Sequence, residues 1–213
     1  MAMRKVMGVE TEYGIISRNL DISPSVASSI LVNSYGDDGP SLRVWDFLGE
    51  TPHLDAREDG PTGAGHPLVE PMMANAVLPN GARYYVDHAH PEYSTPECAT
   101  PSQTVLHDRA GELVIEESMR RALLRLPEGA ELVAYKNNSD GKGNSYGCHE
   151  NYLVPRELPF GRIQSAMLAH FVTRQVFCGA GKVGVEMPRE GEPRPVFQIS
   201  QRADFSRRRS VSR

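Results

Sequence analysis

The chain has 213 residues, of which 39% are hydrophobic and 23% charged, the composition of an ordinary globular protein with a buried core. Its formal net charge of -4 argues against the basic face that binds nucleic-acid phosphates, so no nucleic-acid partner is expected. The sequence has no run of about 18 apolar residues, and Glu10 and Glu12 lie where a signal peptide would be apolar. It therefore predicts a cytoplasmic protein without membrane contact. The three cysteines lack CxxC spacing, which predicts reduced thiols.

Residues 4–16 alternate apolar and polar side chains, which predicts one half-buried strand. With a period of two, Glu10 and Glu12 would lie on the same face of the sheet. Neighbouring carboxylates repel each other, so this arrangement favours a cation between them. Residues 23–70 are rich in Gly, Pro, Asp and Ser, which predicts a short helix and then a mobile inserted loop over about 40–72.

Residues 80–88 begin with an Asn-Gly turn signal and resume the strand pattern, with Arg83, Tyr85 and Asp87 on one face. Residues 100–103 have the form of a capping box with proline at the first helical position, which predicts a long helix. The apolar stripe expected to face the core consists of Val105, Leu106, Leu113, Val114 and Leu123.

The C-terminal half has strand patterns at 131–137 and 147–155, joined by a polar, glycine-rich loop over 138–146. A second helix over about 162–177 would end at Gly179, and residues 196–202 would form a last strand. Strands in hairpin-like groups with helices inserted between them predict an α+β fold, in which helices cover one face of an antiparallel sheet.

The densest group of ionisable side chains lies at the end of one predicted strand and consists of Arg83, Tyr85, Asp87, His88, His90 and Glu92. By itself this group is most simply a solvated strand end. The pair of glutamates at 10 and 12 adds the hard oxygen ligands that Mg²⁺ prefers, so together they favour a site for magnesium and nucleotide. Because no GxxxxGK[ST] phosphate loop occurs, ATP would have to lie on the sheet, where Arg83 and Thr95 could contact phosphate.

Zinc is an alternative to magnesium. His88, His90 and Glu92 alternate along one predicted strand face, and zinc accepts two imidazoles and a carboxylate. Pro91 would disturb this geometry, which makes the zinc hypothesis the weaker one.

The strand over 147–155 carries a further pair, His149 and Asn151, on one face. These two residues are either hydrogen-bonded core residues or part of the site. A nucleophilic dyad of Cys148 and His149 is not expected, because neighbours on a strand point to opposite faces.

Five blocks of the sequence carry a resemblance to a known family: MGVETEYGI, NGARYYVDHAHPEYSTPE, YKNNSDGKGNSYGCHENYL, FVTRQVFCGAGKVG and FQISQRADF. They resemble the Pup ligases and Pup deamidases/depupylases of actinobacterial pupylation, from residue 4 to 205 outside the loop. Within this family, DHAHPEYS, the GKG at 141–143, SQRADF and the segment 43–58 resemble the depupylase branch. Cys148 and the surroundings of Asp108 point to the ligase branch, which is the alternative.

The resemblance implies a glutamine-synthetase-like cradle with ATP and Mg²⁺ as cofactors, and Pup and pupylated proteins as partners linked to the proteasome. It implies that Asp87 is the catalytic aspartate, as nucleophile or general base. The implied Mg²⁺ ligands are Glu10, Glu12, Tyr85, Glu92 and His149. The implied ATP contacts are Gly8, Arg83, Ser94, Thr95, Glu97 and Asn151. The implied reaction is hydrolysis of the side-chain amide of Pup's C-terminal glutamine, or of the isopeptide bond between Pup and a substrate lysine.

Members of this family are considerably longer, so residues 1–205 are expected to be the N-terminal part of a cradle that is incomplete at its C-terminal side. Relatives continue with Ile-Glu-Glu-Glu-Val-Gly-Leu, and codons for that text read one base later give Ser-Arg-Arg-Arg-Ser-Val-Ser. Residues 206–212 have that sequence, so 206–213 are interpreted as an out-of-frame tail. An inactive truncated remnant that still binds nucleotide or Pup is therefore a further alternative.

Overall fold

The computed structural model describes residues 5–36, 74–141, 143, 145–186, 191 and 196–206. They belong to two compact units: the first contains the chain up to Asn137 together with Gly147–Leu153, and the second contains Asn138–Tyr146 and the chain from Val154. The predicted inserted loop at about 40–72 lies outside the described residues, as does the predicted tail after residue 206. The extent of a single domain over 1–205 stays a prediction.

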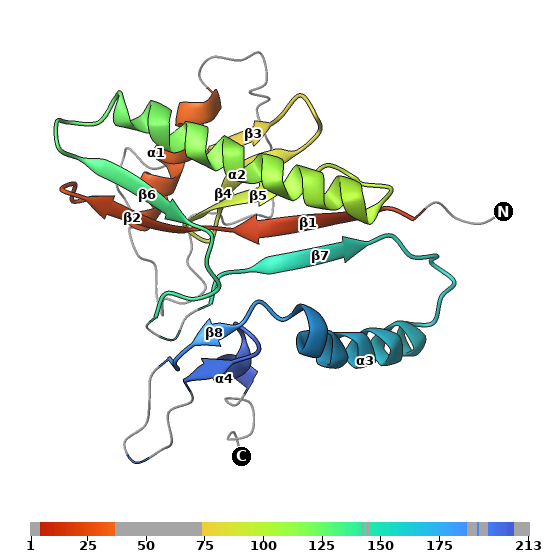
Figure 1. The fold of residues 1–213 in the computed structure, drawn as a ribbon. Coiled ribbons are helices and arrows are strands. Elements are labelled where there is room, and N and C mark those ends of the chain that lie inside the picture. The colour runs from red at the N-terminus through yellow and green to blue at the C-terminus, as the bar shows by residue number, and fades with distance from the viewer. Residues whose placement is uncertain are drawn as a thin grey trace. The chain divides into compact units, whose positions relative to one another are not determined.

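An antiparallel five-stranded sheet forms the centre of the first unit (Figure 1). Its strands, in spatial order, are β3 (Asn75–Val77), β4 (Arg83–Asp87), β5 (His90–Ser94), β1 (Met7–Glu12) and β7 (Cys148–Tyr152). The strand β1 therefore lies inside the sheet, where it pairs with β5 on one side and with β7 on the other.

The prediction of one strand over 4–16 is wrong. Tyr13 separates β1 from β2 (Gly14–Arg18), and β2 pairs with β6 (Glu131–Tyr135) in a two-stranded sheet of its own. The Tyr13 side chain is only 2% exposed, and its backbone N–H donates to the carbonyl of Pro91 at 2.9 Å. A buried tyrosine thus marks the point at which the chain leaves one sheet for the other.

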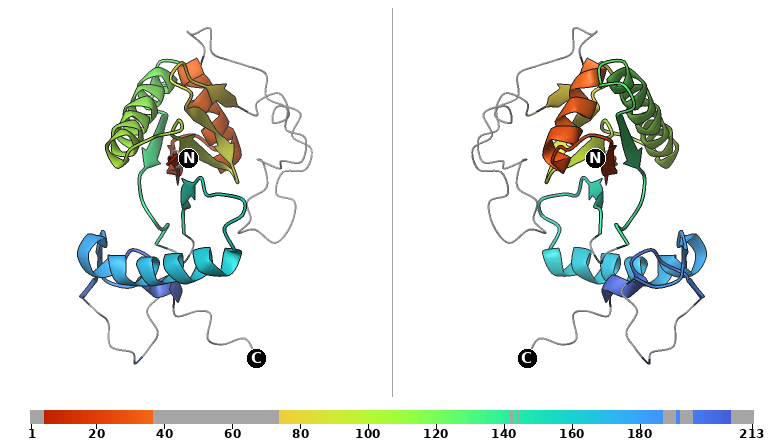
Figure 2. Two further views of the ribbon diagram at one scale, coloured as in Figure 1. Left: turned by 90° about the vertical axis from the view of Figure 1, so that its right-hand side faces the viewer. Right: turned by 90° about the vertical axis from the view of Figure 1, so that its left-hand side faces the viewer.

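Two helices, α1 (Pro24–Gly36) and α2 (Pro101–Leu123), lie side by side on the same face of the five-stranded sheet (Figure 2). Tyr84 and Tyr93 point from the sheet into the core that these helices cover, where Val32, Val114 and Ile115 pack against them. Both tyrosines are at most 1% exposed. The predicted antiparallel sheet with helices on one face is confirmed for this unit.

The start of α2 follows the predicted capping box. Thr100 is the N-cap, and its hydroxyl accepts a hydrogen bond from the Gln103 backbone N–H at 3.2 Å. The Gln103 side chain in turn accepts from the Ala99 N–H at 2.9 Å. Both bonds satisfy backbone donors that have no partner within the helix.

The predicted apolar stripe of α2 is wrong except at Val114, because the other four side chains are exposed: Val105, Leu106, Leu113 and Leu123. The helix instead buries mostly small or polar side chains, among them Gly111 and Ser118. A Cβ on Gly111 would lie 2.4 Å from Cδ1 of Tyr93, so the helix can approach the sheet here only with glycine.

The second unit contains α3 (Phe160–Cys178), β8 (Lys182–Val183), β9 (Phe197–Gln198) and α4 (Ala203–Ser206). The predicted second helix and its end at Gly179 are confirmed, whereas the predicted strand over 196–202 shrinks to the two residues of β9. Within this unit, Lys182 of β8 forms ion pairs with Glu186 at 2.8 Å and with Asp204 of α4 at 3.1 Å, and all three side chains are at most 11% exposed. No helix among the described residues is long and apolar enough to cross a membrane.

Candidate active site

The polar side chains singled out in the sequence lie on the sheet face opposite α1 and α2, in cross-strand rows. One row consists of Arg83, Ser94, Glu10 and His149, each paired with the next. The adjacent row consists of Tyr85, Glu92 and Glu12. Because paired residues share a face of the sheet, these rows confirm the period-two predictions for 10 and 12 and for 83 and 85. Asp87 lies on the same face, since its carboxylate lies within 4.8 Å of that of Glu12.

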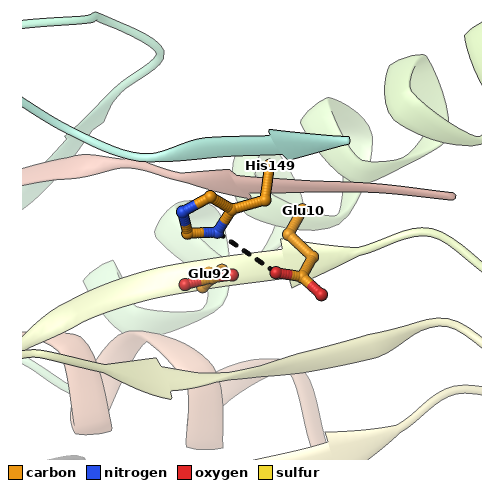
Figure 3. Close-up of side chains that lie close together, drawn as sticks. All are labelled: Glu10, Glu92 and His149. Carbon is orange, nitrogen blue, oxygen red and sulfur yellow. Dashed lines mark hydrogen bonds and ion pairs between the residues drawn. The ribbon is translucent and has the colours of Figure 1, made fainter. Parts of the chain in front are cut away.

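The first group of ligand atoms comes from Glu10, Glu92 and His149 (Figure 3). One atom from each of Glu10, Glu92 and His149 lies within 4.8 Å of the other two. One Glu10 oxygen is 3.2 Å from His149 Nδ1, and the other accepts a hydrogen bond from Asn151 Nδ2 at 3.0 Å. His149 and Asn151 therefore share a face, as predicted, and both orient the Glu10 carboxylate.

Glu92 is the most buried carboxyl group of the site, with 1% of the residue exposed. Its Oε1 accepts a hydrogen bond from the Tyr85 hydroxyl at 2.8 Å, while its Oε2 is buried without a hydrogen-bond partner among the described residues. Burial raises the pKa of the Glu92 carboxyl from 4.5 to about 8; the Tyr85 hydrogen bond opposes this, and Asp87, Glu12 and Glu10 add to it. A buried carboxylate oxygen without a partner is costly, which fits a position where a cation binds.

The Tyr85 hydroxyl is neutral in this arrangement, since burial, followed by the neighbouring Glu92 charge, raises its pKa far above the ordinary value. Its proton is directed at Glu92, and Ser94 Oγ lies 3.4 Å from its oxygen. Direct ligation of Mg²⁺ by Tyr85 stays a prediction.

A second group of ligand atoms, within 4.8 Å of one another, comes from Glu12, Asp87 and His88. His88 Nδ1 lies 2.6 Å from Asp87 Oδ2, and Glu12 Oε2 accepts a hydrogen bond from the Gly147 N–H at 2.7 Å. The sequence pattern predicts neither of these partners of Asp87 and Glu12. Only the position of His88 next to Asp87 could have indicated the first contact, and nothing in the sequence pattern indicates the second.

The strand geometry assumed for the zinc alternative is wrong. His88 does not lie on a strand but in a two-residue turn with Ala89, and β5 begins only at His90. Within the described part of the chain, the two groups above are those in which three or more acidic, histidine or cysteine side chains could hold a metal ion, and neither combines His88 with His90 and Glu92.

A groove of about 400 Å³ adjoins Glu10. Five of the six residues predicted to contact ATP line it: Gly8, Ser94, Thr95, Glu97 and Asn151. A Cβ on Gly8 would lie 3.3 Å from Thr95 Oγ1, so glycine leaves the space beside the Thr95 hydroxyl free of a side chain. Thr95 Oγ1 accepts a hydrogen bond from the Val9 N–H at 3.0 Å, which fixes the hydroxyl at the groove wall.

Arg83, the sixth, does not belong to the lining of this groove. Its Nε donates to Asn75 Oδ1 at 3.2 Å, and its guanidinium carbon lies 3.8 Å from the centre of the Tyr85 ring. Stacking on a ring fixes the plane of a guanidinium group. The side chain is thereby held on the same face as Glu92.

Comparisons with known proteins agree with this architecture. A family model described as "Pup-ligase protein" matches residues 5–212. The chain is 50% identical over 215 residues to a depupylase of Acidothermus cellulolyticus, covering 95% of this chain and 41% of the relative. It is 45% identical over 213 residues to the Pup deamidase/depupylase of Mycobacterium tuberculosis H37Rv, again covering 95% and 41%.

A Pup–protein ligase of Nocardia farcinica is 50% identical over 208 residues, covering 94% of this chain and 38% of the relative. The crystal structure of the complex between the prokaryotic ubiquitin-like protein Pup and its ligase PafA matches with a TM-score of 0.69 and 30% identity. That match covers 99% of this chain and 37% of the other, and it confirms the predicted fold. The chain thus spans about two fifths of the length of these relatives, and it belongs to the Pup-ligase protein family.

Proposed function

We propose that this chain carries the nucleotide and metal face of an ATP-dependent hydrolase that deamidates the C-terminal glutamine of Pup and cleaves the bond between Pup and a substrate lysine. The observation that carries the proposal is the convergence of Glu10, Glu92 and His149 on one sheet face, between Asp87 and a groove lined by the expected ATP contacts. Relatives named depupylase and Pup deamidase/depupylase support this branch, as do the motifs DHAHPEYS and SQRADF.

The first group of ligand atoms suits Mg²⁺. Glu10 and Glu92 supply hard carboxylate oxygens, and the partnerless Glu92 Oε2 is the group that most needs a cation. Glu12 adds a further carboxylate in the neighbouring row, and His149 orients Glu10. When bound, Mg²⁺ would neutralise the charge of nucleotide phosphate oxygens next to these carboxylates.

The groove next to Glu10 suits the nucleotide. Gly8 leaves room for a planar group, and the polar side chains of Ser94, Thr95 and Asn151 offer hydrogen bonds along the wall. Arg83 lies outside the groove lining but on the same sheet face, where its guanidinium stacks on the Tyr85 ring and supplies a cationic group that can pair with phosphate oxygens. Glu97 is an exposed residue of the groove lining.

Asp87 is suited to the chemical step because its side chain is 32% exposed, so that a substrate carbonyl or a water molecule can reach it. As nucleophile its carboxylate would bond to the carbonyl carbon, and the C–N bond would break as ammonia or the lysine amine leaves with a proton from solvent. A water molecule would then hydrolyse the anhydride and restore the carboxylate. As general base it would take the proton of an attacking water molecule. Both routes require the ionised carboxylate and fail with an amide in its place.

Pup with a C-terminal glutamine and Pup–lysine conjugates are the proposed substrates, in a cytoplasmic protein linked to the proteasome. The ligase function is the second candidate, because a ligase from Nocardia farcinica is as similar in identity as the depupylases. A depupylase cleaves the bond between Pup and lysine, whereas a ligase forms it, so one set of assays distinguishes the two candidates.

The test measures ammonia release from glutamine-ended Pup and release of Pup from a lysine conjugate, each with ATP and Mg²⁺. Asp87→Asn should abolish both activities, while Asp21→Asn, which changes an exposed aspartate outside the site, should leave them intact. Conjugation of glutamate-ended Pup to lysine without hydrolysis would assign the protein to the ligases. Nucleotide binding without either reaction would mark the chain as a binding remnant and refute the proposal.

A further inference from the structure

We propose that His88 is a positioning residue for Asp87: its Nδ1–H holds one oxygen of the Asp87 carboxylate, so that the other oxygen faces the substrate. The inference rests on the proposed function, in which Asp87 carries the chemical step. His88 Nδ1 lies 2.6 Å from Asp87 Oδ2, a short hydrogen-bond distance. Since a carboxylate can only accept, the imidazole must donate in this bond.

The backbone around His88 is built to present this donor. His88 has φ 44° and Ala89 has φ 67°, while Asp87 pairs with His90 across the hairpin. Two central residues with positive φ are typical of a type I′ turn, where Asn-Gly is the favoured pair. Neither residue here is asparagine or glycine, so the turn keeps a strained backbone with an imidazole at its first central position.

A buried contact from α1 holds the turn in this strained shape. Ser28, which is 0% exposed, donates its hydroxyl proton to the Ala89 carbonyl at 2.8 Å. A buried hydrogen bond to the turn backbone fixes the direction in which the His88 side chain leaves the chain. Strain that the surrounding structure maintains is a feature of functional sites.

The three other carboxylates of the two groups of ligand atoms also have a donor that orients them. Asn151 donates to Glu10, the Gly147 backbone to Glu12, and Tyr85 to Glu92. His88 provides the corresponding contact for Asp87, and it is the only hydrogen-bond partner of that side chain in the described part of the chain. Without it, repulsion from neighbouring Glu12 would turn the Asp87 carboxylate away, because the two lie in one group of ligand atoms.

Two substitutions distinguish the effect of the hydrogen-bond donor from the effect of the turn conformation. His88→Asn places an amide N–H close to the position of Nδ1 and tolerates positive φ, whereas His88→Gly accepts the same φ but removes the donor. His88→Gly should lower kcat of Pup deamidation roughly 10- to 100-fold, the effect of one hydrogen bond to a charged group. His88→Asn should restore most of that loss, and KM for Pup and the affinity for ATP should stay near wild type in both variants.

Equal losses in His88→Asn and His88→Gly would overturn the inference, because the imidazole itself would then be required. Wild-type kcat in His88→Gly would overturn it as well. A measurement that needs no turnover keeps the inference separate from the proposed function: ¹⁵N NMR of the histidine rings should show His88 as the Nδ1–H tautomer, and Asp87→Ala should remove this preference. An Nε2–H tautomer in the otherwise unchanged chain would refute the hydrogen bond even if Pup proved to be no substrate.

Discussion

Glu92→Gln tests whether one buried carboxyl group makes the stability of this fold depend on pH and on a divalent cation. The substitution keeps the shape of the side chain and the acceptor that receives the Tyr85 hydroxyl proton at 2.8 Å. It removes the ability to ionise and the carboxylate oxygen that has no hydrogen-bond partner among the described residues. Any difference between the two proteins in how stability depends on pH or on Mg²⁺ therefore reports on the charge.

The size of the effect follows from the pKa. Burial keeps the folded Glu92 carboxyl protonated up to a pKa of about 8, whereas its ordinary value is 4.5. Between these values the folded state binds one more proton than the unfolded chain, so stability falls as the pH rises through the interval. Each pKa unit corresponds to about 1.4 kcal/mol, so the metal-free protein should lose roughly 3–5 kcal/mol across it, and Glu92→Gln should lose none of this.

Urea unfolding at about pH 5, 6, 7 and 8, first with chelator and then with Mg²⁺, measures both dependences. In chelator, the free energy of unfolding should decrease with pH in the wild type, and the curve of Glu92→Gln should lack this decrease. Mg²⁺ should restore the wild type at high pH, where the ion takes the place of the proton, and should help the variant much less. Parallel curves in chelator would refute the argument from burial, and an equal gain from Mg²⁺ would remove Glu92 from the ligand set.

Two glycines give further predictions. Gly111→Ala should destabilise the first unit by about 1–3 kcal/mol, because the added Cβ would lie 2.4 Å from the Tyr93 ring. Gly161→Ala in α3 is the control, since nothing lies within 4 Å of its added Cβ, and thermal unfolding should show no loss there. Gly147→Ala should weaken Mg²⁺ binding several-fold in calorimetry, because its Cβ would lie 2.7 Å from a Glu12 carboxylate oxygen. Unchanged affinity would mean that the Glu12 carboxylate moves aside without consequence.

The sheet face that carries the candidate site could be predicted from the sequence, because successive side chains of a strand point to opposite faces with a period of two. Arg83, Tyr85 and Asp87 share a face for this reason, as do Glu10 and Glu12. The partners of these side chains come from the register between strands distant in sequence, which a periodic pattern does not contain. The contact between Glu12 and the Gly147 backbone spans 135 residues and is of this kind.

The errors in the fold have a related cause. Residues before and after Tyr13 have the same alternation, so the pattern cannot tell that β1 and β2 belong to different sheets. The apolar positions of α2 predicted a buried stripe at Leu106 and Leu113, yet the helix packs through Gly111 because the Tyr93 ring fills the space beneath it. Local hydrophobicity gives the period of an element, whereas the shape of the opposing surface selects the face that is buried.

The position of β1 inside the sheet sets the order in which this site can form during synthesis. Glu10 leaves the ribosome early, but His149 and Asn151, which orient it, follow 139 and 141 residues later. At roughly 5–20 residues per second, the nascent chain spends on the order of ten seconds with one edge of β1 unpaired. Such an edge is a template for pairing with other strands, so an inner strand of the finished sheet is an edge strand of the growing one. Slow translation before residue 148 should therefore favour aggregation of the nascent chain, and faster synthesis of the segment up to the end of β7 should suppress it.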